Sequence, residues 1–222
     1  MVALKNVRFA YGDGGFALSV EALDLHRGER IACVGPSGSG KTTLAHLMAG
    51  ILVPDQGTVM LDGQQLSGAA DSTRRALRVS KVGMVFQQFA LLAHLTGFEN
   101  ILLPYHVSSQ LLLDDGAETR ARELTAAMGI DHVLTRRPAR LSQGERQRLA
   151  ICRALVTQPG LVIADEPTGN LDPRATETTL ELLTDQVAAS GATLLVVTHD
   201  HSLLSRFHRV LQTTADGRVV PA

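Results

Sequence analysis

The residues best suited to chemistry begin with a glycine-rich stretch that ends in a lysine and two threonines. Glycines let a backbone wind so that successive N–H groups point at phosphate oxygens, and the start of a following helix adds positive partial charge. In this pattern Lys41 places its charge at the β- and γ-phosphates, and the Thr42 hydroxyl faces Mg²⁺. The alternative, a glycine-rich turn that happens to contain a lysine, would need eight ordered positions to match by accident. The stretch comprises Gly35, Pro36, Ser37, Gly38, Ser39, Gly40, Lys41 and Thr42, with Thr43 next.

Two carboxylates follow an apolar run at residues 161–164. Acids at the carboxyl end of a buried strand lie at the ligand edge of an open α/β sheet. There Asp165 can hold Mg²⁺ directly or through water, and Glu166 can polarise a water for attack on a γ-phosphate. Taken alone, the two acids could also be turn formers after a strand. The glycine-rich stretch upstream favours the catalytic interpretation.

Composition excludes several classes of protein. The chain has 222 residues, 45% of them hydrophobic, which predicts a folded domain rather than a disordered one. Its formal net charge of -1 argues against a nucleic-acid binder. No apolar run approaches the ~18 residues of a membrane span, and the first residues do not resemble a signal peptide. We therefore expect a cytoplasmic chain that reaches a membrane only through a partner, with Cys33 and Cys152 as buried free thiols.

The hydrophobic pattern predicts an α/β core. Continuous apolar runs indicate strands covered on both faces, and apolar residues at helical spacing indicate amphipathic helices. Strand signals are absent between about residues 87 and 158, which predicts an all-helical insertion. We expect one domain over 1–222, with a core at 1–86 and 159–222. Expected strands are 7–11, 17–25, 31–34, 58–61, 82–86, 161–164 and 194–198, with a hairpin at 209–212 and 218–220; expected helices include one from 41 and those at 72–78 and 174–190.

Four more segments resemble those of the ATP-binding-cassette (ABC) ATPases. Residues 141–145 (Leu-Ser-Gln-Gly-Glu) resemble the family's signature motif, 85–87 its Q-loop, 169–172 its D-loop, and 198–200 its switch histidine. They occur in family order, and the resemblance covers essentially the whole chain. Residues 95–101, 145–148 and 165–172 further resemble the lipoprotein-releasing (LolD), macrolide-exporting (MacB) and cell-division (FtsE) subgroup.

The resemblance implies a fold and a function. The fold is a P-loop NTPase, with a RecA-like core, an antiparallel β subdomain and an inserted helical subdomain. Two copies pair head to tail around two ATP molecules with Mg²⁺, and ATP hydrolysis energises integral membrane permease subunits at the inner face of the cell membrane. Three alternatives stay open: a regulatory or mechanotransmitting ATPase that moves no substrate, a nucleotide-binding module with little catalysis, and a DNA-repair or translation ABC protein.

The resemblance also implies roles for single residues. Tyr11 stacks on adenine, although it could be an ordinary strand-end tyrosine. Gln87 reaches Mg²⁺ or the attacking water and transmits the state of the site to the membrane partner. The adjacent Gln88 is the alternative residue for this role. His199 binds the γ-phosphate and holds Glu166 and the water. Asp172 contacts the opposite subunit, caps a helix, or does both.

The signature segment has two possible roles, and at one position it differs from the family. Ser142 and Glu145 form a capping-box pattern, which opens a helix. In the family the same serine and helix start, with Gln143, Gly144 and Glu145 here, face the γ-phosphate across the dimer. The family usually has glycine where this chain has Gln143, so we expect slower hydrolysis than with glycine. Residues 89–105 are implied to dock the permease. There Phe89, Leu91, Leu92, Leu95 and Phe98 form either an apolar patch or part of the insertion's core.

Overall fold

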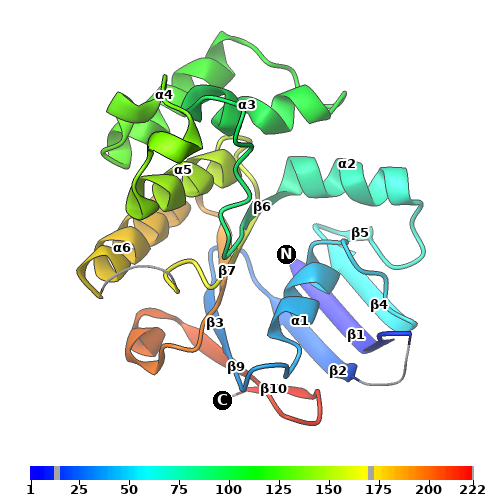
Figure 1. Cartoon of the computed structure of the whole chain (residues 1–222). Coiled ribbons are helices and arrows are strands. Elements are labelled where there is room, and N and C mark those ends of the chain that lie inside the picture. Colours follow the sequence, from blue (N-terminus) through cyan, green and yellow to red (C-terminus); the bar gives the residue numbers. More distant parts are fainter. Residues whose placement is uncertain (13–15, 170–172, 222) are drawn as a thin grey trace.

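The computed structural model describes residues 1–12, 16–169 and 173–221. Its centre is a six-stranded sheet in the order β10-β9-β3-β8-β7-β6 (Figure 1). All neighbouring pairs are parallel except β9 and β10, which form the expected antiparallel hairpin. The strands are β3 (Arg30–Val34), β6 (Val82–Val85), β7 (Leu161–Asp165), β8 (Thr193–Val197), β9 (Arg209–Thr213) and β10 (Val219–Pro221).

This central sheet separates two hydrophobic cores, and its strands contribute to both. In β3, Ile31 and Cys33 face one core while Ala32 faces the other, because successive side chains of a strand point to opposite faces. The residues of β7 and β8 alternate in the same way. A strand that is buried on both faces reads as a continuous apolar run, which is why these strands could be predicted.

A second sheet packs beside the first. It is antiparallel, in the order β2-β1-β4-β5, and the phosphate-loop helix α1 (Lys41–Met48) shares its core. Two elements differ from expectation: β1 begins five residues earlier than predicted, and β5 is a two-residue strand with no hydrophobic signal. The strands are β1 (Val2–Ala10), β2 (Ala17–Leu25), β4 (Gln56–Leu61) and β5 (Gln64–Gln65).

The second sheet and α1 lie against one face of the central sheet. Helices cover its other face and extend beyond it (Figure 1). In the described part of the chain no strand lies between β6 and β7, a segment that holds α3 (Gly97–Val107), α4 (Asp115–Ala127) and α5 (Gln143–Leu155). The sequence reading missed α3, although a capping box of Thr96 and Glu99 opens it. The other helices are α2 (Asp71–Lys81) and α6 (Pro173–Ser190), with short 3₁₀ segments at Asp131–Val133, Pro138–Arg140 and His201–Arg206.

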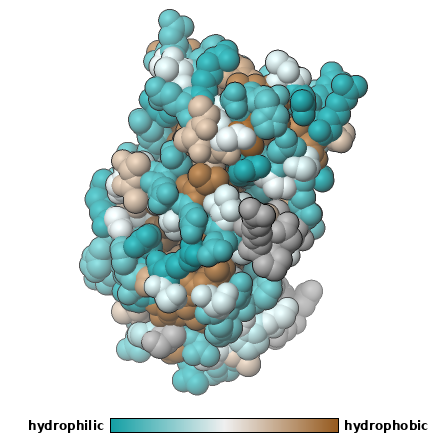
Figure 2. Space-filling model, turned by 90° about the vertical axis from the view of Figure 1, so that its left-hand side faces the viewer, coloured by the Kyte–Doolittle hydropathy of each residue, from teal (hydrophilic) through white to brown (hydrophobic). Residues whose placement is uncertain are grey.

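Figure 2 shows the side of the molecule that lies at the left in Figure 1, where hydrophilic residues predominate and apolar residues form separate patches. Among the described residues, no helix is both long and apolar enough to cross a membrane. Cys33 and Cys152 are buried free thiols, as predicted, and burial raises the pKa of Cys33 to about 12.

Candidate functional site

The glycine-rich stretch forms a loop between β3 and α1. Gly40 caps the helix with a left-handed φ of 96°, and its carbonyl accepts the first helical hydrogen bond from the Leu44 N–H at 2.8 Å. The Lys41 ammonium folds across the loop and donates to the carbonyls of Gly35 and Pro36, at 2.8 and 2.9 Å. The lysine charge and the helix N-terminus therefore face the same hollow, which suits an anion.

A buried hydroxyl pair anchors this loop to β9, a strand that neighbours β3 but lies far from it in the sequence. The hydroxyls of Ser39 and Thr213 lie 2.5 Å apart, and these residues are 1% and 0% exposed. Thr213 also donates to the Val34 carbonyl at 3.2 Å. Sequence reasoning missed Thr213, because nothing local to residue 213 shows that β9 lies next to β3.

The Thr42 hydroxyl donates to a carboxylate oxygen of Asp165 at 2.9 Å, across 123 residues of sequence. Hydroxyl and carboxylate oxygens are ligands that Mg²⁺ accepts. The donor set therefore fits this ion.

Glu166 and His199 meet at the edge of the central sheet. His199 Nδ1 lies 2.9 Å from both carboxylate oxygens of Glu166. The Glu166 side chain is only 14% exposed, while the His199 side chain is 72% exposed. Glu166 has a left-handed φ of 47°, and its N–H donates to the Val197 carbonyl at 2.9 Å. A hydrogen bond from the adjacent strand thus helps to hold an uncommon backbone conformation for a non-glycine residue.

Lys41, Thr42, Asp165 and Glu166 share one cavity of about 360 Å³, whereas His199 lines another cavity and contacts this one through Glu166. Its volume lies in the range of small-ligand sites. At one end Tyr11 stands edge-on to Phe9, and its hydroxyl lies 3.3 Å from that of Thr43. Phe16 also lines the cavity and was not predicted; its ring would collide with any side chain at Gly40. The lining residues are Tyr11, Phe16, Ser37, Gly38, Gly40, Lys41, Thr42, Thr43, Gln87, Asp165, Glu166 and Val197.

The signature segment lies elsewhere, at the N-terminus of α5, and contributes nothing to that lining as far as the described residues go. The predicted capping box is confirmed: Ser142 N–H and hydroxyl donate to Glu145 at 2.7 and 2.8 Å, and the Glu145 N–H donates back at 3.3 Å. His132 lies 2.8 Å from the other carboxylate oxygen. These hydrogen bonds, chiefly those from Ser142, lower the pKa of Glu145 to about 2. Asp172 lies outside the described residues.

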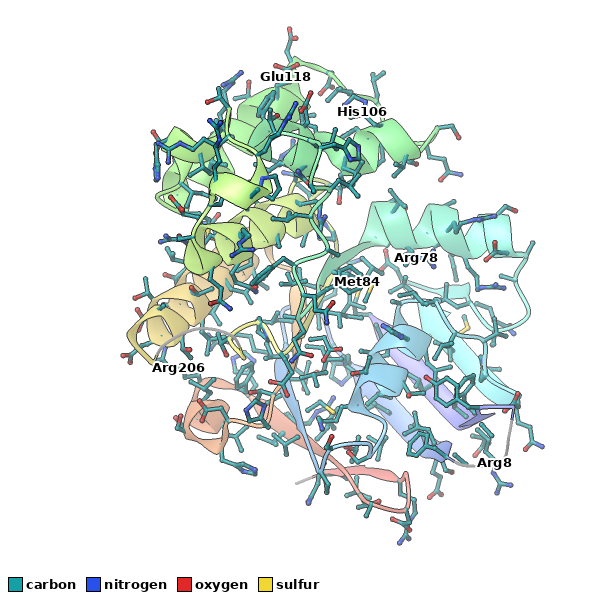
Figure 3. The ribbon with its side chains drawn as sticks, viewed as in Figure 1. Arg8, Arg78, Met84, His106, Glu118 and Arg206 are labelled. Atoms are coloured by element: carbon teal, nitrogen blue, oxygen red, sulfur yellow. The ribbon has the colours of Figure 1, made fainter. Side chains whose placement is uncertain are left out.

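An apolar groove of about 280 Å³ lies between α2, β6, α3 and α5. Figure 3 labels two of its residues, Arg78 and Met84, where α2 meets β6. Of the five residues considered for an apolar patch, Leu91 and Phe98 instead pack against the buried core. The groove is lined by Ile51, Arg78, Val79, Val82, Gly83, Met84, Phe86, Ala90, Leu103, Pro104, Val107, Arg153, Ala154 and Thr157.

Comparison with known proteins agrees with this geometry. The family model described as ABC transporter matches residues 18–169. The chain belongs to the ABC transporter family. As a member it is an ATP-binding ATPase, and the fold expected from the resemblance is confirmed.

Curated relatives match over almost the whole chain. The lipoprotein-releasing system ATP-binding protein LolD of Pseudomonas syringae pv. tomato is 40% identical, over 100% of this chain and 98% of its own length. LolD of Psychrobacter arcticus is 42% identical, over 93% and 92%. These matches agree with the subgroup that the sequence motifs indicated.

Solved structures also match over almost the whole chain. The chain is similar to the ATP-binding cassette MJ0796, solved as a dimer in a post-hydrolysis state with ADP and Pi, with a TM-score of 0.87, 33% identity and coverage of 99% and 96%. It is also similar to cbiO1 of Clostridium perfringens, part of the cbiONQ ABC transporter complex, with a TM-score of 0.86, 28% identity and coverage of 99% and 86%.

Proposed function

We propose that this chain is the ATP-binding and ATP-hydrolysing subunit of an ABC transporter complex of the lipoprotein-release or export type. One observation carries the proposal: Lys41, Thr42, Asp165 and Glu166 line one cavity and His199 contacts Glu166, so three distant parts of the sequence meet there. The relatives named LolD support the type of complex.

The phosphate loop holds the triphosphate. Residues 35–43 supply backbone N–H groups, and the Lys41 ammonium exchanges its two carbonyl partners for phosphate oxygens. Tyr11 and the neighbouring Phe16 face the base. Thr42, Asp165 and Gln87 would hold Mg²⁺, which would neutralise charge that develops on the phosphates.

Glu166 acts as general base. Its carboxylate accepts a proton from water as the water oxygen bonds to the γ-phosphorus, and the bond to the β-phosphate oxygen breaks to give ADP and phosphate. His199 orients that carboxylate through the 2.9 Å contact, and its exposed ring is free to contact the γ-phosphate.

A second copy of the chain completes each site. The residues of the signature segment, Ser142, Gln143, Gly144 and Glu145, serve the ATP bound by the other copy, and Asp172 contacts that copy. This arrangement explains why a signature helix start suited to an anion lies away from the cavity of its own chain.

The permease docks on the apolar groove between the helical subdomain, 87–158, and the nucleotide-binding core, 1–86 and 159–222. We place the complex at the inner face of the cell membrane, with this subunit on the cytoplasmic side. An apolar groove between two subdomains suits a helical segment of a partner.

The test compares the wild type with Glu166→Gln in Mg²⁺-dependent ATP hydrolysis, with and without the permease expressed beside it, and records molecular mass with ATP. We expect turnover from the wild type. We expect Glu166→Gln to lose at least about 100-fold in turnover and to remain dimeric with ATP. Glu118→Gln, an exposed acid on α4 (Figure 3), is the matched control and keeps wild-type turnover. A wild type that stays inert with the permease, or a fully active Glu166→Gln, would overturn the proposal.

A further inference from the structure

Arg153, near the end of α5, is an arginine buried in the fold. It is only 8% exposed, and among the described residues no ion pair includes it. Burial lowers its pKa to about 10. A buried cation without a carboxylate partner is costly unless its donors are satisfied, so its contacts reveal why it is there.

The guanidinium donates to two consecutive backbone carbonyls. One nitrogen lies 2.6 Å from the Phe89 oxygen and the other 2.5 Å from the Ala90 oxygen. Both acceptor residues have left-handed φ values, 61° and 50°. Two such non-glycine residues in a row are uncommon and cost conformational free energy, which Arg153 offsets by bonding both carbonyls.

A second arginine of α5 contacts the same turn. The Arg146 guanidinium lies 5.7 Å from the centroid of the Phe89 ring. Arg146 and Arg153 are seven residues apart, so they lie on one face of the helix. The turn at residues 89–90, which follows Gln87 by two residues, is therefore attached to α5.

The same helix begins at the signature segment, since Ser142 is its N-cap. This helix thus carries the signature residues at one end. Near its other end it carries Arg153, whose two hydrogen bonds to the turn at residues 89–90 form a clamp on the loop that contains Gln87 (the Gln87 loop). We propose that Arg153 is a positioning residue that fixes Gln87 through the Phe89–Ala90 turn, and so ties Gln87 in one ATP site to the signature residues that serve the other. This inference rests on the proposed function.

The groove adds a reason for the clamp to matter. Arg153 and Ala90 both line the apolar groove, together with Phe86 of the same loop. A permease segment seated there touches the clamp directly. A movement of the permease segment in the groove would then displace Arg153 and the Phe89–Ala90 turn, and so change the position of Gln87 directly.

The activity test is a double-mutant cycle. Arg153→Met keeps the apolar length of the side chain and removes both donors, while Arg153→Lys keeps the charge but cannot reproduce the fork of two parallel bonds. We expect Arg153→Met to lower kcat by between about 10-fold and 100-fold, because small displacements of a positioned group are costly, with little change in ATP affinity. In a Gln87→Ala background the same change should cost less than about twofold, since its effect acts through Gln87.

The matched control is Arg120→Met. Arg120 also donates to a main-chain carbonyl in the helical region, that of Val156 at 3.1 Å, and its other hydrogen bond among the described residues goes to the Tyr105 hydroxyl at 3.4 Å. We expect it to leave kcat unchanged in both backgrounds. An equal loss from Arg153→Met in both backgrounds would mean a merely structural role and would overturn the proposal.

Hydrogen exchange provides a readout that does not depend on hydrolysis. The Phe89 and Ala90 amides donate to the carbonyls of Phe86 and Gln88, at 2.9 and 2.6 Å. We expect faster exchange at residues 87–91 in Arg153→Met, with the amides of β3 and β8 unchanged. Should that variant not fold, Arg153→Lys carries both measurements. Unchanged exchange at 87–91 would overturn the clamp, whereas an inert wild type with faster exchange in the variant would overturn the proposed function and leave the clamp standing.

Discussion

His199 Nδ1 is equidistant, at 2.9 Å, from the two carboxylate oxygens of Glu166, and the pair lies where β7 and β8 end side by side. The histidine thus restrains rotation of the carboxylate while most of its own ring faces solvent. A carboxylate that is held at both oxygens has fewer orientations in which it can accept a proton from water.

Replacing His199 should therefore abolish hydrolysis but not nucleotide-driven pairing. We expect His199→Ala to lower kcat by at least about 100-fold, because the general base loses its orientation. Dimerisation with ATP, measured by light scattering, should persist. The exposed neighbour His201 supplies the control, since His201→Ala should hydrolyse ATP normally. Wild-type turnover in His199→Ala would contradict this role.

Thr213 should be needed for the phosphate loop although it lies outside the loop in sequence. Thr213→Val preserves shape but leaves the buried Ser39 hydroxyl without its partner, which should reduce the free energy of unfolding by about 1–3 kcal/mol. ATP affinity should weaken as well. Thr213→Ser retains the hydroxyl and should lie close to the wild type in both urea denaturation and ATP titration. Equal behaviour of the valine and serine variants would show that the hydroxyl pair is dispensable.

Gln143 should slow hydrolysis. It is the first residue of α5 and is exposed, so its side chain adds bulk where the proposed function brings the signature segment close to phosphate. We expect Gln143→Gly to raise kcat at saturating ATP by about threefold to tenfold, at a stability cost near 1 kcal/mol or less. Gln143→Ala separates bulk from backbone freedom, because it shortens the side chain without adding flexibility. Unchanged or lower turnover in the glycine variant would refute the idea.

Glu145 should make stability depend on pH in the acidic range. Its folded pKa of about 2 lies below the ordinary value of 4.5, so its contribution is present above about pH 4.5 and is lost as pH falls toward 2. We expect Glu145→Gln to be less stable than the wild type near neutral pH by about 1 kcal/mol, the usual worth of a cap. The difference should narrow between pH 4.5 and 2 in urea titrations at fixed pH. A difference that stays constant over that range would mean that ionisation of Glu145 does not contribute.

The sequence by itself determined the parts whose signals are local. The phosphate loop depends on residue types at eight consecutive positions, and the buried strands at 31–34, 161–164 and 194–198 are continuous apolar runs. The capping box of Ser142 and Glu145 follows from their spacing alone. Family resemblance supplied the ABC assignment, because the signature segment and His199 occur in a fixed order.

Only the tertiary structure decided which distant residues meet. Thr42 reaches Asp165, Ser39 reaches Thr213, and Arg153 reaches the turn after Gln87, over separations of 123, 174 and 63 to 64 residues. Such contacts are set by strand order and helix packing, which bring together segments with no local pattern in common. The same reason explains why β5 escaped prediction, because it is two polar residues paired with β4. The helix α3 does carry a local signal, the capping box of Thr96 and Glu99, and its packing against α5 is what only the tertiary structure shows.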